Sequence, residues 1–329
     1  MTTTSLPPAG LALRPATPDD APAVRDLLNR VDLLEIGRAE TELHEVRADL
    51  EHPGTDLSRD SWLLFDGEEL VGYGLVRDRS GGERIDLDQY VLPPYQAEAL
   101  HLFALMEHRA AEWAAANGAS RAVLHLLLNT RPTLDTPAIR RRGWERVRRY
   151  HVMARRVGPR SDPAPVPPPG VTLRDCRSEE DRRTAHRLEE EAFAGHFDHH
   201  PRGFEQWWRD IDGARLDWSL TWIATLEGVG DAAVLRTRDD RAVHGWADRL
   251  GVLPAARGRG VGGHLLRHFF AHYAALGRDR VALGVDTANA TGALALYEAH
   301  GMTTDFAVDT WELVLPVPEV LPVPPVFGA

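Results

Sequence analysis

The hydrophobic residues of the chain follow two alternating patterns, one with a period of two and one with a period near 3.6, and their order recurs. The segment LALRPATPDDAPAVRDLLNRV, starting at Leu11, predicts a short strand, a polar helix start and an amphipathic helix. The segment VTLRDCRSEEDRRTAHRLEEEAF, starting at Val171, predicts the same elements. The chain is therefore expected to contain an internal repeat.

Two further pairs of segments extend the repeat. SWLLFDGEELVGYGLVRD from Ser61 and TWIATLEGVGDAAVLRTRD from Thr221 each combine an apolar run, a turn and a second apolar run, which predicts a hairpin. YVLPPYQAEALHLFALMEH from Tyr90 parallels GVLPAARGRGVGGHLLRHF from Gly251, and both predict a strand end followed by a helix. Each copy therefore combines strands and helices in one α/β (α+β) domain.

Proline-rich segments mark the expected boundaries. Prolines in residues 159–170 block helix and sheet continuation and favour an extended linker. The predicted organisation is a first domain over 1–158, the linker over 159–170, a second domain over 171–316 and a proline-rich tail over 317–329.

Length and charge narrow the class of protein. With 329 residues the chain exceeds the usual size of one core. A net charge of −11 disfavours nucleic acid as a partner and suits a small amine. We expect a cytoplasmic protein that is not a membrane protein, because no apolar run approaches the ~20 residues of a membrane span. It is expected to be a monomer or a homodimer.

The turn after Gly251 carries the most informative motif. The spacing Gly258-x-Gly260-x-x-Gly263 fits a dinucleotide fingerprint, and Arg257-x-x-Gly260-x-Gly262 fits a pyrophosphate loop for acyl-coenzyme A. A dinucleotide site needs an acidic residue ~20 positions further on, where this chain has the apolar Leu283. The coenzyme A interpretation is therefore favoured over a dinucleotide site, and a purely structural glycine turn is the other alternative.

Residues 257–262 resemble motif A of the GCN5-related N-acetyltransferases (GNAT superfamily). VALGVDTANATGALALYEAHGM further on resembles motif B, with Asn289 ahead of a helix that carries Tyr297. The tandem arrangement resembles that of mycothiol synthase. The resemblance implies two tandem GNAT domains, each a mixed, mostly antiparallel twisted sheet flanked by helices. It also implies a splay between the strand before motif A and the strand RVALGVD.

The resemblance further implies roles for individual residues. Tyr297 would protonate the departing thiolate, although a core aromatic is the alternative for it. Asn289 would contact the cofactor, or else make an ordinary helix cap. The residues expected to bind acetyl-coenzyme A are Leu250, Val252, Arg257, Gly258, Arg259, Gly260, Val261, Gly262 and Asn289.

The general base departs from the family pattern. Where many members have a glutamate, six residues before Val252, this chain has Trp246. Strand alternation places His244, Trp246 and Asp248 on one face, so Asp248 or His244 is expected to act as the base, through a water molecule.

The stretch FAGHFDHHPRGFEQWWRD lies where the family's substrate loop lies. His196, His199 and Trp207 in it, together with Trp246, are expected to recognise the acceptor. No metal site is expected, because the histidines and the carboxylate lack a defined spacing.

The first copy does not keep the motif. Aligned at Val91 and Val252, it has Gln96, Ala99 and His101 in place of Arg257, Gly260 and Gly262, and Ile139 in place of Tyr297. The resulting hypothesis is an acetyl-coenzyme A-dependent N-acetyltransferase acting on a small-molecule amine, such as a specialised metabolite, an aminoglycoside-like compound or a mycothiol-like precursor. A protein N-acetyltransferase and a non-catalytic acyl-coenzyme A-binding module are the alternatives.

Overall fold

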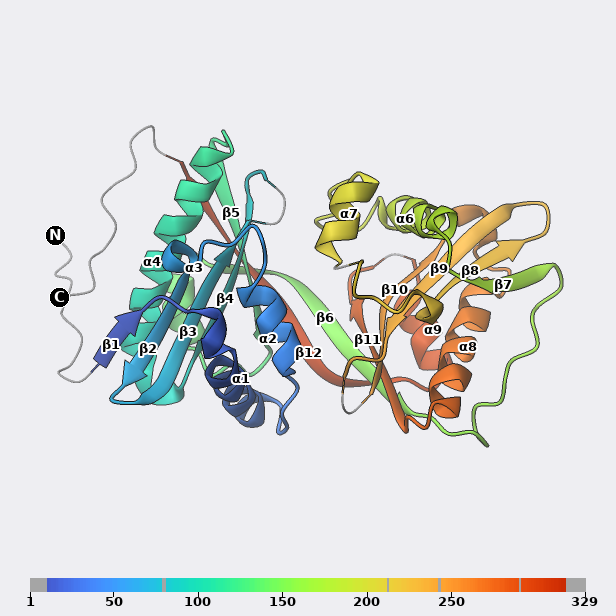
Figure 1. The fold of residues 1–329 in the computed structure, drawn as a ribbon, viewed down its shortest axis with the longest axis horizontal. Coiled ribbons are helices and arrows are strands. Elements are labelled where there is room, and N and C mark those ends of the chain that lie inside the picture. Colours follow the sequence, from blue (N-terminus) through green and yellow to red (C-terminus); the bar gives the residue numbers. More distant parts are fainter. Residues whose placement is uncertain (1–10, 79–80, 212, 242–243, 290, 318–329) are drawn as a thin grey trace. The chain divides into compact units, whose positions relative to one another are not determined.

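A computed structural model describes residues 11–78, 81–211, 213–241, 244–289 and 291–317 (Figure 1). The chain forms two compact units. Unit 1 comprises residues 1–149 and 308–329, and unit 2 comprises residues 150–307. The tail beyond residue 317 and the first ten residues lie outside the described ranges. Within those ranges, no helix combines the length and the apolar content that crossing a bilayer requires.

Unit 1 is an α/β unit with helices on both faces of its sheet. Its elements are β1 (Leu11–Arg14), η1 (Pro18–Asp20), α1 (Ala21–Glu35), α2 (Leu43–Leu50), α3 (Leu57–Asp60), β2 (Ser61–Asp66), β3 (Glu69–Arg77), β4 (Arg84–Val91), η2 (Pro93–Tyr95), α4 (Gln96–Ala116), β5 (Arg121–Asn129), α5 (Thr136–Arg141) and the start of β6 (Glu145–Arg156). The strand order is β1-β2-β3-β4-β5, followed by β12. β4 and β5 run parallel, and the other neighbouring pairs are antiparallel.

Unit 2 repeats this plan. Its elements are β7 (Val171–Asp175), α6 (Glu179–Phe193), α7 (Phe204–Asp210), η3 (Trp218–Leu220), β8 (Thr221–Leu226), β9 (Gly230–Arg238), β10 (Gly245–Val252), η4 (Pro254–Ala256), α8 (Val261–Ala275), β11 (Arg280–Asp286), α9 (Ala293–Ala299) and the start of β12 (Thr303–Pro316). The order is β7-β8-β9-β10-β11, followed by β6, and only β10 and β11 run parallel. The predicted repeat, both hairpins and the mixed sheet flanked by helices are confirmed.

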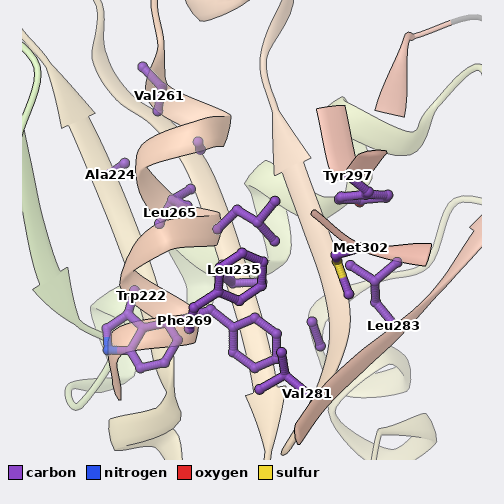
Figure 2. Packing of buried hydrophobic residues seen from close by; sticks show 14 of the residues in the cluster. Trp222, Ala224, Leu235, Val261, Leu265, Phe269, Val281, Leu283, Tyr297 and Met302 are labelled. Carbon is purple, nitrogen blue, oxygen red and sulfur yellow. The ribbon is translucent and has the colours of Figure 1, made fainter. Parts of the chain in front are cut away.

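The core of unit 2 has one apolar cluster on each face of the sheet. On one face, α8 packs Val261, Leu265 and Phe269 toward strand residues such as Leu235 (Figure 2). On the other face, α6 packs Leu188 against Ile223 and Val234. Alternation along β9 sends Leu235 to one cluster and Val234 to the other, as expected for a strand covered on both faces.

The linker was predicted to separate the two domains, but the borders of the two units lie elsewhere. One border falls inside β6 and the other inside β12. Residues 150–156 of β6 pair with β11 in unit 2, although β6 ends the first sequence repeat. Residues 308–316 of β12 pair with β5 in unit 1, although β12 ends the second repeat. The linker over 159–170 therefore lies within unit 2. A proline-rich composition marks where regular structure stops, but it carries no information on which sheet the next strand joins.

This strand assignment predicts which unit a core mutation weakens. Trp311 of β12 is 4% exposed and belongs to the core of unit 1, whereas Trp222 of β8 is 2% exposed and belongs to the core of unit 2. Trp311→Ala should destabilise unit 1 by about 3–5 kcal/mol, since it removes a large buried ring. Limited proteolysis mapped by mass spectrometry should give new cuts within 11–149 for Trp311→Ala and within 150–307 for Trp222→Ala. New cuts of Trp311→Ala confined to unit 2 would contradict the assignment.

Candidate functional site

A glycine-rich loop joins β10 to α8. Gly258 and Gly260 have φ of 72° and 79°, in the left-handed region that side chains disfavour, and Gly260 is the N-cap of α8. A Cβ on Gly258 would meet nothing within 4 Å, and one on Gly260 would meet only Pro168, at 3.6 Å. The loop therefore needs glycine for its backbone and leaves open space beside that backbone.

The loop presents hydrogen-bond donors to this space. The first hydrogen bond of α8 runs from the N–H of His264 to the carbonyl of Gly260, at 2.9 Å. The preceding N–H groups, from Gly258 to Gly263, donate to no acceptor in the described part of the chain. Arg257 and Arg259 are exposed beside them. Free N–H groups, the helix dipole and two cations together suit an anion such as a diphosphate.

The strands beside the loop separate. The parallel ladder joins Gly245–Ala247 of β10 to Val281–Leu283 of β11 and stops there. At that point the register of β10 against β9 shifts between Ala247 and Arg249, which makes Asp248 the extra residue of a bulge. A bulge bends its strand. Residues 249–252 continue to pair with β9 but not with β11, so one backbone edge of β10, its free edge, has no strand partner among the described residues.

Tyr297 lies on α9, near Met302 and Leu283 (Figure 2). The residue is 6% exposed, and burial raises the pKa of Tyr297 to about 12. Its hydroxyl has no hydrogen-bond partner among the described residues, yet it is not one of the fully enclosed unpaired atoms. The ring is thus part of the core, as the alternative interpretation expected, while the hydroxyl is available to donate a proton.

Asn289 forms the turn ahead of α9 and does not cap that helix. Its side-chain carbonyl accepts a hydrogen bond from the N–H of Thr291 at 2.8 Å, and the N-cap of α9 is Gly292, with φ of 76°. This is an Asx turn, in which the side chain shapes its own backbone.

Asp248 belongs to a buried ion-pair network. Arg236 donates to Asp248 at 3.1 Å and to Glu189 of α6 at 2.9 Å, and the indole of Trp207 donates to Glu189 at 3.0 Å. Burial raises the pKa of Asp248, while Arg236 opposes that rise. Removing one member would leave an uncompensated buried charge, so these groups hold α6 against β9 and β10.

His244 and Trp246 are the other two residues that were predicted to share a strand face with Asp248. His244 is 2% exposed, and its ring centroid lies 5.8 Å from that of Trp246. Trp246 is half-buried, with the guanidinium carbon of Arg241 5.0 Å from its ring centroid. The predicted alternation of His244, Trp246 and Asp248 agrees with these contacts, and the bulge then adds Arg249 to the same face.

The predicted acceptor residues separate into two groups. His196 and His199 lie half-buried in the loop after α6, where Nε2 of His199 is 3.3 Å from Glu190. Trp207, in contrast, is 0% exposed and packs with Phe204 and Trp218 in the core, so it has no surface to offer an acceptor. Sequence reasoning could not separate the two tryptophans of α7, because neighbouring positions on a seven-residue helix give too little periodicity.

Sequence reasoning gave no role of its own to Phe193, the last residue of α6. Its Cε2 atom is 3.3 Å from the position of a Cβ on Gly251, so its ring lies against the free half of β10. An aromatic residue at the end of an amphipathic helix was a weak signal, and the contact with Gly251 depends on the fold.

The same gap exists in unit 1, but side chains bridge it. The ladder of β4 with β5 ends at Leu87 and Leu126. Glu35 accepts from Asn129 at 2.7 Å and from the N–H of Thr133 at 2.5 Å. The Thr133 hydroxyl donates to the carbonyl of Val91 at 3.3 Å, on the β4 residue that corresponds to Val252.

A comparison with protein-family models found one match, which lies within unit 2. Residues 217–303 match the model of the acetyltransferase (GNAT) domain. No curated protein sequence matches the chain significantly.

Solved structures match over nearly the whole chain. A GCN5-related N-acetyltransferase from Sphaerobacter thermophilus is 26% identical, with a TM-score of 0.78, and the match covers 96% of this chain and 98% of that one. A tandem GNAT protein from the clavulanic acid biosynthesis pathway is 16% identical, with a TM-score of 0.67 and coverage of 94% and 99%. A glucosamine N-acetyltransferase region of a fungal multi-domain β-N-acetylglucosaminidase is 15% identical, with a TM-score of 0.62 and coverage of 93% and 38%. The resemblance to mycothiol synthase stays a prediction.

The bridged gap predicts that unit 1 cannot be made to bind coenzyme A by restoring glycines alone. Ala99→Gly combined with His101→Gly should leave one coenzyme A bound per chain, because Thr133 and Glu35 still close the space beside β4. Isothermal titration calorimetry measures this stoichiometry. A second binding event in the double variant would contradict the prediction.

Proposed function

Because residues 217–303 form a GNAT acetyltransferase domain, we propose that the chain transfers the acetyl group of acetyl-coenzyme A to the amine of a small molecule, in unit 2. One observation carries the proposal: the free edge of β10 adjoins a glycine loop whose N–H groups donate to no acceptor among the described residues. The two features match the two parts of coenzyme A. The loop N–H groups suit its anionic diphosphate, and the strand edge suits its extended, amide-containing arm.

The donor side of the site follows from these contacts. The N–H groups from Gly258 to Gly263 would bind the diphosphate, with Arg257 and Arg259 adding charge. Leu250 and Val252, on the free edge of β10, would offer backbone groups to the amides of the pantetheine arm, as a neighbouring strand would. Arg257 donates to the Val252 carbonyl at 3.1 Å, which ties the two parts of the site together.

Tyr297 would supply the proton that the departing thiolate needs. With a pKa of about 12, its phenol stays protonated throughout the neutral range and is a weak enough acid to donate only as negative charge develops on sulfur. A thiolate that leaves without such a donor must find its proton in water.

The acceptor class is assigned from charge and from chemistry. The net charge of −11 favours the approach of an amine that is cationic in solution. The glucosamine N-acetyltransferase region with the same fold supports including an amino sugar among the test compounds. Glucosamine, spermidine, phenylethylamine and a lysine-containing peptide would separate small-molecule from protein acetylation, and the absence of turnover with bound coenzyme A would support a binding module instead.

Gly260→Leu should abolish coenzyme A binding, because a side chain at Gly260 would occupy the space beside the loop and strain its left-handed backbone. Gly228→Leu is the matched control, since Gly228 has φ of 77° in the turn between β8 and β9. The two variants should lose similar stability, about 1–2 kcal/mol, for the same backbone reason. Calorimetry should show binding only in the Gly228 variant, and unchanged affinity in a folded Gly260 variant would defeat the assignment.

Tyr297→Phe should lower kcat by about 10²–10⁴-fold while the KM for acetyl-coenzyme A stays nearly constant, because it removes the acid and keeps the ring. Tyr273→Phe is the control: Tyr273 is also a buried tyrosine of the core, and its hydroxyl donates to Thr237 at 3.0 Å. That variant should lose about 1 kcal/mol of stability and no rate. Full turnover by Tyr297→Phe, where chemistry limits the rate, would remove the proposed acid.

A further inference from the structure

We propose that His196, in the loop between α6 and α7, is the general base that takes the proton from the acceptor amine. The inference rests on the proposed function and adds a residue to it. It replaces Asp248 and His244, the two candidates that strand alternation suggests.

The position of His196 is fixed by the strand that borders the gap. Its ring centroid is 4.5 Å from that of Phe193, and its N–H donates to the Phe193 carbonyl at 2.8 Å. Phe193 in turn lies against Gly251, and the guanidinium carbon of Arg249 is 5.5 Å from the Phe193 ring centroid. Gly251 and Arg249 both belong to the half of β10 that has left β11. Through Phe193, the imidazole is therefore held near the face of this half of β10.

The charged groups that act on the pKa of His196 come from β10, β11, the glycine loop and the loop of His196 itself. Asp286 ends β11, Arg249 lies on β10, Arg257 begins the glycine loop, and His199 follows in the same loop. Asp286 alone raises the pKa of His196. Burial, the largest cause, lowers that pKa below its ordinary value of 6.5, and the other three groups lower it further. The imidazole is therefore neutral at neutral pH, the state in which it can accept a proton.

The alternative bases are either paired with other charged groups or buried. Asp248 accepts a hydrogen bond from buried Arg236, whose other partner is Glu189. His199 lies 3.3 Å from Glu190. His244 is only 2% exposed. The imidazole of His196, in contrast, has no hydrogen-bond partner within the described ranges and is only half-buried, so an amine can reach it.

Two residues move the protons of the transfer, so that the reaction balances. The amine nitrogen forms a bond to the acetyl carbon, the carbon–sulfur bond breaks, and the sulfur takes both electrons of that bond. His196 accepts the proton that the amine loses, and Tyr297 donates one to the sulfur. His196 then releases its proton to water and Tyr297 regains one, which restores both residues.

The test compares His196→Gln with His200→Gln. His200 is in the same loop, with Nε2 3.2 Å from Asp198 and a side chain that is 60% exposed, so it serves as the matched control. The probe is whichever of glucosamine, spermidine, phenylethylamine and the lysine peptide the unmodified protein acetylates fastest. His196→Gln should lower kcat by about 10²–10⁴-fold with little change in the KM for acetyl-coenzyme A. His200→Gln should keep the full rate.

The pH profile separates a base from a structural residue. In the unmodified protein kcat/KM should fall as pH drops through a pKa below 6.5, because the imidazole becomes protonated there. This acidic limb should be absent in His196→Gln and present in Asp248→Asn and His244→Gln. Added imidazole should restore part of the rate of His196→Ala in proportion to its concentration.

Three results would overturn the proposal in distinguishable ways. A full rate and an intact acidic limb in His196→Gln would remove His196 as the base and leave the acetyltransferase function standing. Loss of the limb in Asp248→Asn alone would return the role to Asp248. Failure of the unmodified protein to acetylate any amine of the panel would reject the proposed function and the base together.

Discussion

The bulge at Asp248 is the constraint on which the candidate site depends. It lets β10 stay paired with β9 along its whole length while its other edge leaves β11 after Ala247. A free strand edge ordinarily promotes aggregation, because its unpaired N–H and C=O groups can bind a strand of another chain. Here the edge ends at a glycine loop whose N–H groups have no acceptor in the part of the chain that the structure describes, next to a helix dipole. The buried ion pairs of Arg236 with Asp248 and with Glu189 hold the bulge against α6.

Unit 1 shows that the fold alone does not provide this site. Its parallel strands also separate, after Leu87 and Leu126, but Glu35 and Thr133 bridge the gap with the chain's own hydrogen bonds. Its loop has Ala99 and His101 where unit 2 has glycines. Two copies of one plan therefore differ in whether the free backbone groups are satisfied internally or left for a ligand, which is a property of a few side chains.

Local features of the sequence predicted the local features of the site. The glycines at 258 and 260 have the left-handed backbone that only glycine adopts easily, and Tyr297 lies on the expected helix. Features that depend on distant partners were not predictable. Trp207 was expected to recognise the acceptor but is enclosed by Glu189 of α6 and by Phe204 and Trp218. β12 joins the sheet of unit 1 through pairings with β5 that no linear pattern encodes. The contact of Phe193 with Gly251 is of the same non-local kind.

Hydrogen–deuterium exchange with and without coenzyme A tests the central claim most directly, because the claim concerns particular backbone N–H groups. The account predicts slower exchange on binding in residues 249–252 and 258–263, the free edge of β10 and the glycine loop. It predicts no change at the corresponding residues of unit 1, 88–91 and 97–102. Slower exchange confined to unit 1, or tight binding with unchanged exchange in residues 258–263, would contradict it.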